Sequence, residues 1–409
     1  MPSANQTMSN RPIDVIAAGH ICLDIIPQLT SHQCRAEDLF VPGGLVQVGP
    51  ATLALGGSVA NTGLALHRLG ATTRVVGKVG GDLLGKVIIE SLRQIDGSIA
   101  ENMVVAAGEP TSYSIVLSPP QVDRGFLHCP GTNNTFVAAN LDKVPWQDTR
   151  ILHFGYPPLM RGTFVDEGRG LAEKFAEVQA VGALVSLDMA MPSAGATNWR
   201  QWLRHVLPHV DVFLPSLDEI QLMLDPLYDF TNESEGRKNG HVVPDVSRLA
   251  ELADELHGFG APIVVIKLGD QGLYLRSSEQ VSILSGRTAW QNFAWQAWQN
   301  RELLAPCFDV DVVGTTGSGD CTIAGFLMAL LQGNGPEAAL CYATAVGAYC
   351  VQSADATSNI PPWSHVEAKL QSPWPQRPLA THWPNWQFCH KRGVYVAPTD
   401  RNSLARAES

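Results

Sequence analysis

Short apolar runs alternate with longer runs of helical spacing along most of the chain. Ile13–Gly19 is a short apolar run that ends in glycine, whereas Val59–Leu69 has helical spacing and is followed by Gly70, which can end a helix. This alternation predicts repeated βα units and therefore an α/β fold with a mostly parallel, doubly wound sheet that carries helices on both faces. The other expected strands are Arg74–Val79, Ile151–Phe154, Leu184–Asp188, Val212–Leu214, Ile263–Leu268 and Val310–Val313, and the other expected helices are Leu83–Gln94, Leu171–Val181, Leu217–Leu224, Val246–His257 and Cys321–Leu331.

Three stretches interrupt this pattern. Thr231–Pro244 and Ser285–Pro306 are expected to be exposed insertions, and the second carries three tryptophans that predict a local cluster or a subunit contact. From Ser372 onward the chain has repeated Pro and Trp without periodicity, which indicates a tail that packs on the surface or is partly free.

Composition narrows the class of protein. A hydrophobic content of 45% and a charged content of 16% are typical of a globular chain. The formal net charge of −11 argues against nucleic acid as a partner. No apolar run approaches the roughly 20 residues of a membrane helix, and the polar start lacks the core of a signal peptide. The eight cysteines form no CxxC pair, so we expect reduced thiols in a cytoplasmic protein, mostly buried, and neither zinc nor disulfides.

The turn Gly314-Thr315-Thr316-Gly317-Ser318-Gly319-Asp320 is the most informative stretch. It lies between an expected strand and an expected helix, so backbone N–H groups and the positive end of the helix can bind phosphate oxygens. Asp320 at the helix start suits a base that removes a proton from a hydroxyl as it attacks phosphorus. The alternative is that Asp320 is the N-cap of an ordinary strand–helix turn.

A second glycine-containing turn matches part of a Walker A loop. Residues 80–86 fit GxxxxGK, but Val87 stands where Ser or Thr should hold Mg²⁺, and Asp82 would place negative charge in the phosphate cradle. We interpret it as a turn that presents Asp82 or its backbone to a pocket, or as a plain turn capped by Asp82.

Four features follow one another in a recognisable order: Asp24 after the first strand, Gly56–Asn61 opening a helix, Gly80–Gly85, and the late turn that ends in Asp320. In this order the chain resembles the ribokinase-like (PfkB) family of carbohydrate and nucleoside kinases from about Ile13 to Ser364. The resemblance implies a kinase domain over residues 11–368 with a small β lid from about 21–55 and 109–133. A C-terminal extension then covers residues 369–409.

The resemblance also implies roles for particular residues. Asp320 is similar to the family's catalytic base, and Gly317, Ser318 and Gly319 resemble its anion hole. The sugar-binding group would be Asp24, Gly56, Gly57 and Asn61, unless Asp24 is a solvated loop carboxylate and Asn61 bonds its own backbone. For the nucleotide, the resemblance points to Lys267, Gly269, Gly272, Thr315 and Thr316, with Ala343–Gly347 near adenine. Lys267 could instead cover the sheet end with its stem.

The chain departs from the family at two positions. The family's NxxE motif reads Ser216-Leu217-Asp218-Glu219 here, so Glu219 either orders the water shell of Mg²⁺ or completes a helix capping box. Gly314 stands where many members have an Asp linked to a monovalent cation, which leaves activation by K⁺ open.

Together these features predict an ATP- and Mg²⁺-dependent kinase that acts on a hydroxyl, primary by preference, of a sugar or polyol. The alternatives are a nucleoside kinase of the same family and a non-catalytic ligand-binding or regulatory protein on the same fold. Residues 12–61 hold one basic residue, Arg35, which favours a neutral substrate over a sugar phosphate. Neither nucleic acid nor a membrane is an expected partner, and the lid predicts a homodimer.

Overall fold

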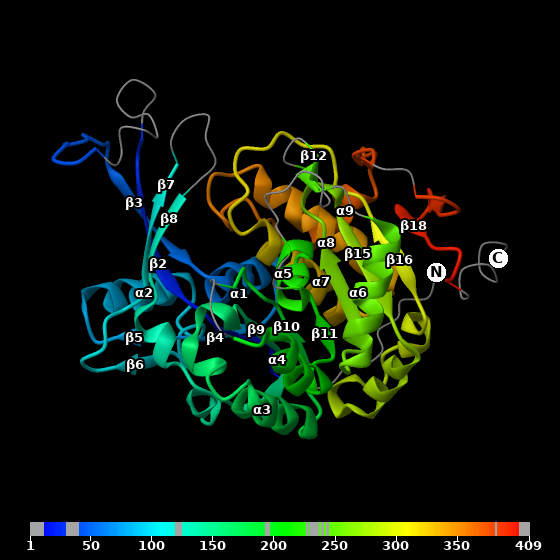
Figure 1. Cartoon of the computed structure of the whole chain (residues 1–409), viewed down its shortest axis with the longest axis horizontal. Helices are drawn as coiled ribbons and strands as arrows, with labels where there is room; N and C mark the ends of the chain where they lie inside the picture. Colours follow the sequence, from blue (N-terminus) through cyan, green and yellow to red (C-terminus); the bar gives the residue numbers. More distant parts are fainter. Residues whose placement is uncertain are drawn as a thin grey trace.

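A ten-stranded sheet with the strand order β17-β18-β16-β15-β14-β11-β10-β9-β1-β4 forms the centre of the molecule (Figure 1). The computed structural model describes residues 12–29, 41–118, 125–192, 197–225, 228, 237–238, 241–242, 245–380 and 383–400. The strands of this sheet are β1 (Ile13–Gly19), β4 (Thr73–Val76), β9 (Thr149–Gly155), β10 (Leu184–Leu187), β11 (Val212–Phe213), β14 (Ile263–Lys267), β15 (Leu273–Ser277), β16 (Glu302–Ala305), β17 (Gln387–Cys389) and β18 (Val394–Val396).

Neighbouring strands are parallel from β4 through β14 and antiparallel from β14 to β17. β14 shows why the sheet needs cover on both sides, because Ile263–Ile266 is fully buried. Val265 packs into one hydrophobic cluster and Val264 into another, as expected when successive side chains point to opposite faces. The predicted α/β fold with a mostly parallel, doubly wound sheet is confirmed.

Helices cover the two faces in separate groups. Residues of α1, α7, α8 and α9 share one buried cluster with the sheet, and residues of α3, α4, α5 and α6 share the other. The helices are α1 (Ser58–Leu69), α2 (Leu83–Ile95), α3 (Arg169–Ala180), α4 (Trp199–Val206), α5 (Leu217–Leu224), α6 (Val246–Gly258), α7 (Ser318–Leu331), α8 (Pro336–Val351) and α9 (Trp363–Leu370).

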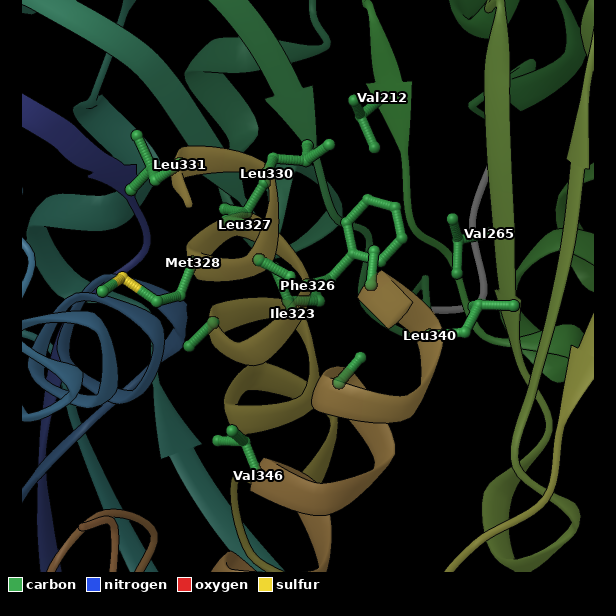
Figure 2. Packing of buried hydrophobic residues seen from close by; sticks show 14 of the residues in the cluster. Val212, Val265, Ile323, Phe326, Leu327, Met328, Leu330, Leu331, Leu340 and Val346 are labelled. Atoms are coloured by element: carbon green, nitrogen blue, oxygen red, sulfur yellow. The ribbon is translucent and has the colours of Figure 1, made fainter. Parts of the chain in front are cut away.

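Helix α7 is apolar on every side, which is typical of a helix buried all round. Figure 2 shows Phe326 between α8 and the sheet residues Val212 and Val265. The two helices approach closely at Gly325, where an added Cβ would lie 2.9 Å from both the Tyr342 carbonyl oxygen and the Val346 Cβ.

A second sheet, with the order β3-β2-β7-β8, stands beside the main one and is here called the lid sheet (Figure 1). It occupies the segments that were expected to build a lid. The chain leaves the main sheet at Gly77, so the single strand expected over Arg74–Val79 is divided between two sheets. The strands outside the main sheet are β2 (Cys22–Pro27), β3 (Ala51–Gly56), β7 (Tyr113–Leu117), β8 (Gly125–Cys129), β5 (Lys78–Gly80), β6 (Val104–Ala106), β12 (Arg237–Lys238) and β13 (His241–Val242).

The prediction of a strand at Val310–Val313 is wrong. The N–H group of Val313 donates to the Val351 carbonyl at the end of α8 rather than to a neighbouring strand, and the Val313 side chain is 64% exposed. The strand of this region is β16, which lies earlier, and Pro306 follows it without an N–H group to continue the ladder.

The segment Ser285–Pro306 is not an exposed insertion, because it contributes β16 and three buried tryptophans, Trp290, Trp295 and Trp298. Their indole rings cluster around Phe293, as the local-cluster interpretation predicted, and the ring centroid of Trp298 lies 5.8 Å from that of Phe326 on α7.

The remaining expectations have mixed outcomes. The segment after Ser372 is not a free tail, since β17 and β18 extend the sheet. Most of Thr231–Pro244 lies outside the described residues. The seven described cysteines are free thiols, and Cys34 lies outside the described part. Across the described ranges, no helix has the length and apolar character needed to cross a bilayer.

We predict that Gly325→Ala lowers the free energy of unfolding by up to about 2 kcal/mol. Overpacking at the α7–α8 contact costs about 1–3 kcal/mol, and the gain in helix propensity offsets about 1 kcal/mol of this. Chemical denaturation measures the change. The control is Gly258→Ala in α6, where an added Cβ meets nothing within 4 Å and stability should stay the same or rise. Equal effects of the two substitutions would contradict the close packing.

Candidate active site

Polar side chains converge at the edge where the parallel strands end. His20, Tyr156 and Asp188 directly follow β1, β9 and β10. Lys267 ends β14, and helix α7 begins nearby at Ser318. Because the carboxyl ends of parallel strands share one edge, this is where an open α/β sheet usually binds its ligands.

Asp320 lies in the first turn of α7 and is 2% exposed. The N-cap of this helix is Gly317, so the alternative that Asp320 is the N-cap is wrong. Its Oδ2 accepts hydrogen bonds from Asn61 Nδ2 at 2.9 Å and from the Tyr156 hydroxyl at 2.8 Å. Thr62 Oγ1 lies 3.4 Å from Oδ1. The Asn61 amide therefore bonds the Asp320 carboxylate across helices.

Burial raises the pKa of Asp320, while hydrogen bonds from Asn61 and Tyr156 and the charge of Lys267 act in the opposite direction. Burial and the nearby carboxylate hold the pKa of Tyr156 well above its usual range, so its hydroxyl stays protonated and remains a donor. The Tyr156 backbone has a φ of 63°, a left-handed conformation that costs a bulky residue free energy. This strained turn aims the hydroxyl at Asp320.

Lys267 forms a buried ion pair with Asp188, with 2.5 Å between Nζ and Oδ1. Burial raises the pKa of Asp188, and the charges of Glu219 and Asp320 raise it further. One ammonium group therefore faces three carboxyl groups. The second oxygen of Asp188 is buried and has no hydrogen-bond partner among the described residues. The carboxyl groups around Lys267 therefore outnumber its single positive charge, and the second oxygen of Asp188 could bind a cation.

Glu219 forms a helix capping box with Ser216 at the start of α5, which was the predicted alternative to a role in binding Mg²⁺. Its Oε2 accepts from the Ser216 N–H at 2.7 Å, and its own N–H donates to Ser216 Oγ at 3.4 Å. In the described part of the chain, no group of three or more His, Cys, Asp or Glu side chains could hold a metal ion by itself. Mg²⁺ usually keeps several waters and uses one or two carboxylates, so Asp188 and Glu219 fit a water-mediated site.

Two cavities meet at the glycine-rich turn. One, here called the lid cavity, has a volume of about 910 Å³ and brings together Asp24, Gly57 and Asn61. The other, here called the turn cavity, has a volume of about 260 Å³ and is lined by Lys267 with the turn Gly269–Gly272. Thr315 lines both cavities, and Thr316 lines the lid cavity.

The turn itself suits an anion. Gly317 has a φ of 69°, and a Cβ there would lie 2.4 Å from the Ala356 Cβ, so only glycine fits without a shift. Ser318 and Gly319 begin α7 and line the turn cavity. The Lys267 ammonium would lie 3.6 Å from a Cβ on Gly319. A helix N-terminus and a lysine thus face the same space.

The other predicted residues take different places. Gly56 does not appear in the lining of either cavity, but it leaves room for Asp24, whose carboxylate would lie 2.3 Å from a Cβ there. Asp82 caps α2 by accepting from Gly85 N–H, so the Walker-like stretch is a plain capped turn. In the segment expected near adenine, Thr344 and Gly347 line the turn cavity.

Four residues of the candidate site were not predicted from the sequence. Asp188 is the last residue of the predicted strand Leu184–Asp188, and Tyr156 lies two residues after the predicted strand Ile151–Phe154, so their place at strand ends was the available signal. Arg161 lines the lid cavity from a short 3₁₀ turn, and Arg377 lines the turn cavity from the C-terminal segment. Neither arginine lies in a motif. Arg161 also weakens the argument for a neutral substrate, which counted basic residues only up to Asn61.

Comparison with known proteins settles the family. The sequence profile described as pfkB family carbohydrate kinase matches residues 14–363, which is most of the chain. The chain belongs to the PfkB family. It is therefore a phosphotransferase of the sugar kinase class. A relative named an uncharacterized sugar kinase, from Archaeoglobus fulgidus, is 23% identical over 301 residues, 73% of this chain and 98% of that protein.

A nucleoside kinase from Methanothermobacter thermautotrophicus is 22% identical over 371 residues, 89% of this chain and 98% of that protein. The solved structure of Arabidopsis thaliana ribokinase with ribose and ATP has a TM-score of 0.63 at 19% identity and covers 88% of this chain and 99% of its own. A putative ribokinase II from E. coli, in complex with ATP and Mg²⁺, has a TM-score of 0.62 at 20% identity, with 88% and 99% covered. These structures establish the ribokinase-like fold of this PfkB protein.

We predict that Lys267→Met lowers the free energy of unfolding by about 3 kcal/mol at pH 8, because it leaves the Asp188 carboxylate buried without its partner. The folded-state pKa of Asp188 is raised above its unfolded value, so the unpaired carboxylate costs more as pH rises and less near pH 5. Denaturation at both pH values measures this. The double substitution with Asp188→Asn should recover most of the loss. Additive effects of the two single substitutions would contradict the ion pair.

Proposed function

We propose that the protein transfers the γ-phosphoryl group of ATP to a hydroxyl, primary by preference, of a sugar or related polyol. The observation that carries the proposal is the buried Asp320 carboxylate at the start of α7, where the lid cavity and the turn cavity share Thr315. In this proposal the acceptor occupies the lid cavity and the nucleotide occupies the turn cavity. PfkB membership and relatives with bound ATP support the assignment.

Asp320 is the proposed base. Its carboxylate would take the proton of the acceptor hydroxyl as that oxygen attacks phosphorus, while Asn61 and Tyr156 hold the carboxylate in place. The backbone amides of Gly317–Gly319 would neutralise the charge that develops on the transferred group, with Lys267 beside them. Phosphoryl transfer requires mainly positioning and charge neutralisation, and these residues can supply both.

Asp188 and Glu219 are the proposed residues that would hold Mg²⁺ through its water shell. The unpartnered Asp188 oxygen and the unbalanced carboxyl groups around Lys267 support this. Bound Mg²⁺ would neutralise phosphate charge. Because Gly314 replaces an acidic residue, we propose no particular residue for K⁺.

The lid cavity offers donors and acceptors for sugar hydroxyls. Asp24 and Asn61 line it together with His20 and His128. Burial lowers the pKa of His20 to about 3 and lowers that of His128, so both rings are neutral near pH 7. Arg161 in the same cavity extends the candidates to acidic sugars.

A nucleoside is the second candidate acceptor. Three aromatic side chains, Phe126, Phe164 and Trp199, line the lid cavity. Aromatic faces of this kind can pack against a nucleobase as well as against a sugar ring. The sequence did not reveal this wall, because its three members lie far apart along the chain.

We also propose that the protein works in the cytoplasm as a homodimer that pairs through the lid. β3 and β8 are the edge strands of the lid sheet. Leu53 on β3 is 54% exposed, and Phe126 and Leu127 on β8 are about half exposed. Exposed apolar edge strands tend to pair with another chain, which would cover these side chains.

We predict ADP release with one acceptor from a panel of ribose, fructose, 2-keto-3-deoxygluconate, fructose 6-phosphate, adenosine and inosine, each with ATP and Mg²⁺. Asp320→Asn should lower kcat about 10²–10⁴-fold because it removes the proposed base, while ATP binding persists. A coupled assay and calorimetry measure the two quantities. Equal turnover in both proteins would refute the role of Asp320. A ligand that stabilises the protein without ADP release would favour a non-catalytic binding protein.

We predict that Tyr156→Phe shifts the acid limb of the kcat/KM pH profile upward by about one pH unit. The hydroxyl stabilises the ionised form of Asp320, so its removal raises the pKa of the base and more of it is protonated at low pH. The profile between pH 5 and 9 measures the shift, with Tyr349→Phe on α8 as the control. A uniform fall in kcat/KM without a shift would assign Tyr156 a packing role only.

A further inference from the structure

The chain beyond the PfkB match lies along the wall of the turn cavity. The family match ends at residue 363, yet the N–H of Arg377 donates to the Cys307 carbonyl at 2.8 Å. The N–H of Asp309 donates to the Pro375 carbonyl, also at 2.8 Å. Residues 307–309 and 375–377 therefore pair as a short antiparallel bridge. This bridge fixes the C-terminal segment against a wall of the cavity, which includes Cys307 and Phe308.

The same segment also contacts the glycine turn that lines the cavity. The N–H of Ala380 donates to Gln271 Oε1 at 2.7 Å, and Gln271 belongs to the Gly269–Gly272 turn. The ring of Trp374 stacks on Phe308 with 4.3 Å between centroids. These two contacts hold residues 374–380 beside the turn cavity.

Arg377 is a half-buried residue of this segment and lines the cavity. Its positive charge lowers the pKa of Cys307, against the effects of burial and Asp270, which together raise that pKa to about 11. Among the described residues, its guanidinium forms no hydrogen bond or ion pair, whereas Arg150, Arg287 and Arg301 each pair with a carboxylate. A guanidinium has only donors, and its best partners are carboxylates and phosphates.

We propose that Arg377 completes the nucleotide site by binding phosphate oxygens of the nucleotide. The inference rests on the proposed function, since it requires a nucleotide in the turn cavity. Lys267 and the start of α7 supply positive charge from the sheet edge, and Arg377 supplies a second cation from the C-terminal segment. The remaining wall of the turn cavity is apolar and includes Val310, Val312 and Val351, which suits the adenine ring of the nucleotide.

The test is calorimetric binding of ADP and of adenosine to the full-length protein without an acceptor. Arg377→Ala should weaken ADP binding about tenfold or more and leave adenosine binding within about twofold, because only ADP carries phosphates. Arg377→Lys should recover part of the ADP affinity. The control is Lys391→Ala, which removes one positive charge from the same segment outside the turn cavity.

Each outcome bears on a different statement. Unchanged ADP affinity in Arg377→Ala would overturn the inference and leave the kinase proposal intact. Equal losses for ADP and adenosine would also overturn it, because they would reflect damage to the cavity wall. A wild-type protein that binds no ADP would refute the proposed function itself. An unchanged melting temperature in Arg377→Ala verifies that the C-terminal segment stays docked, and Arg377→Gln replaces that variant if the temperature falls.

Discussion

A carboxylate buried at the start of an apolar helix is the constraint on which the site depends. Burying an ionised group without partners costs several kcal/mol, and the Asp320 carboxylate takes its hydrogen bonds from outside α7. The partners come from elsewhere: Asn61 from α1, Tyr156 from the end of β9 and Lys267 from the end of β14. These three elements must therefore meet α7 in fixed positions, and the sheet with its buried faces provides that rigidity.

The charges of this region are arranged for ligands that carry opposite charges of their own. The Lys267 ammonium lies near the carboxyl groups of Asp188, Glu219 and Asp320 and near the backbone at the start of α7, which carries Asp320. The protein alone leaves negative charge in excess near Asp188 and positive potential near Gly319. A nucleotide that brings both phosphates and a divalent cation would balance both regions, so binding and charge compensation are coupled.

The sequence predicted the parts of the site whose signal is local. Gly317–Asp320 and Gly57–Asn61 are contiguous motifs, and each lies at the start of an expected helix. Val310–Val313 failed because an apolar run does not specify its hydrogen-bond partner, which here is the end of α8. Tyr156 was missed because its role depends on a left-handed backbone and on a residue 164 positions later. Arg377 has no local signal, since only the docking of the C-terminal segment brings it to the cavity.

The strand order of the main sheet has a consequence for synthesis on the ribosome. From the β4 edge to the β17 edge, spatial order follows chain order except for one exchange at each end. Each new strand can therefore add to the edge left by the previous one as the chain emerges, and domains generally begin to fold from the N-terminus. Helices α7 and α8 follow β16, so Val212 and Val265 remain uncovered until late. A nascent chain stalled before α7 would leave part of one apolar sheet face exposed, which makes it a substrate for chaperones.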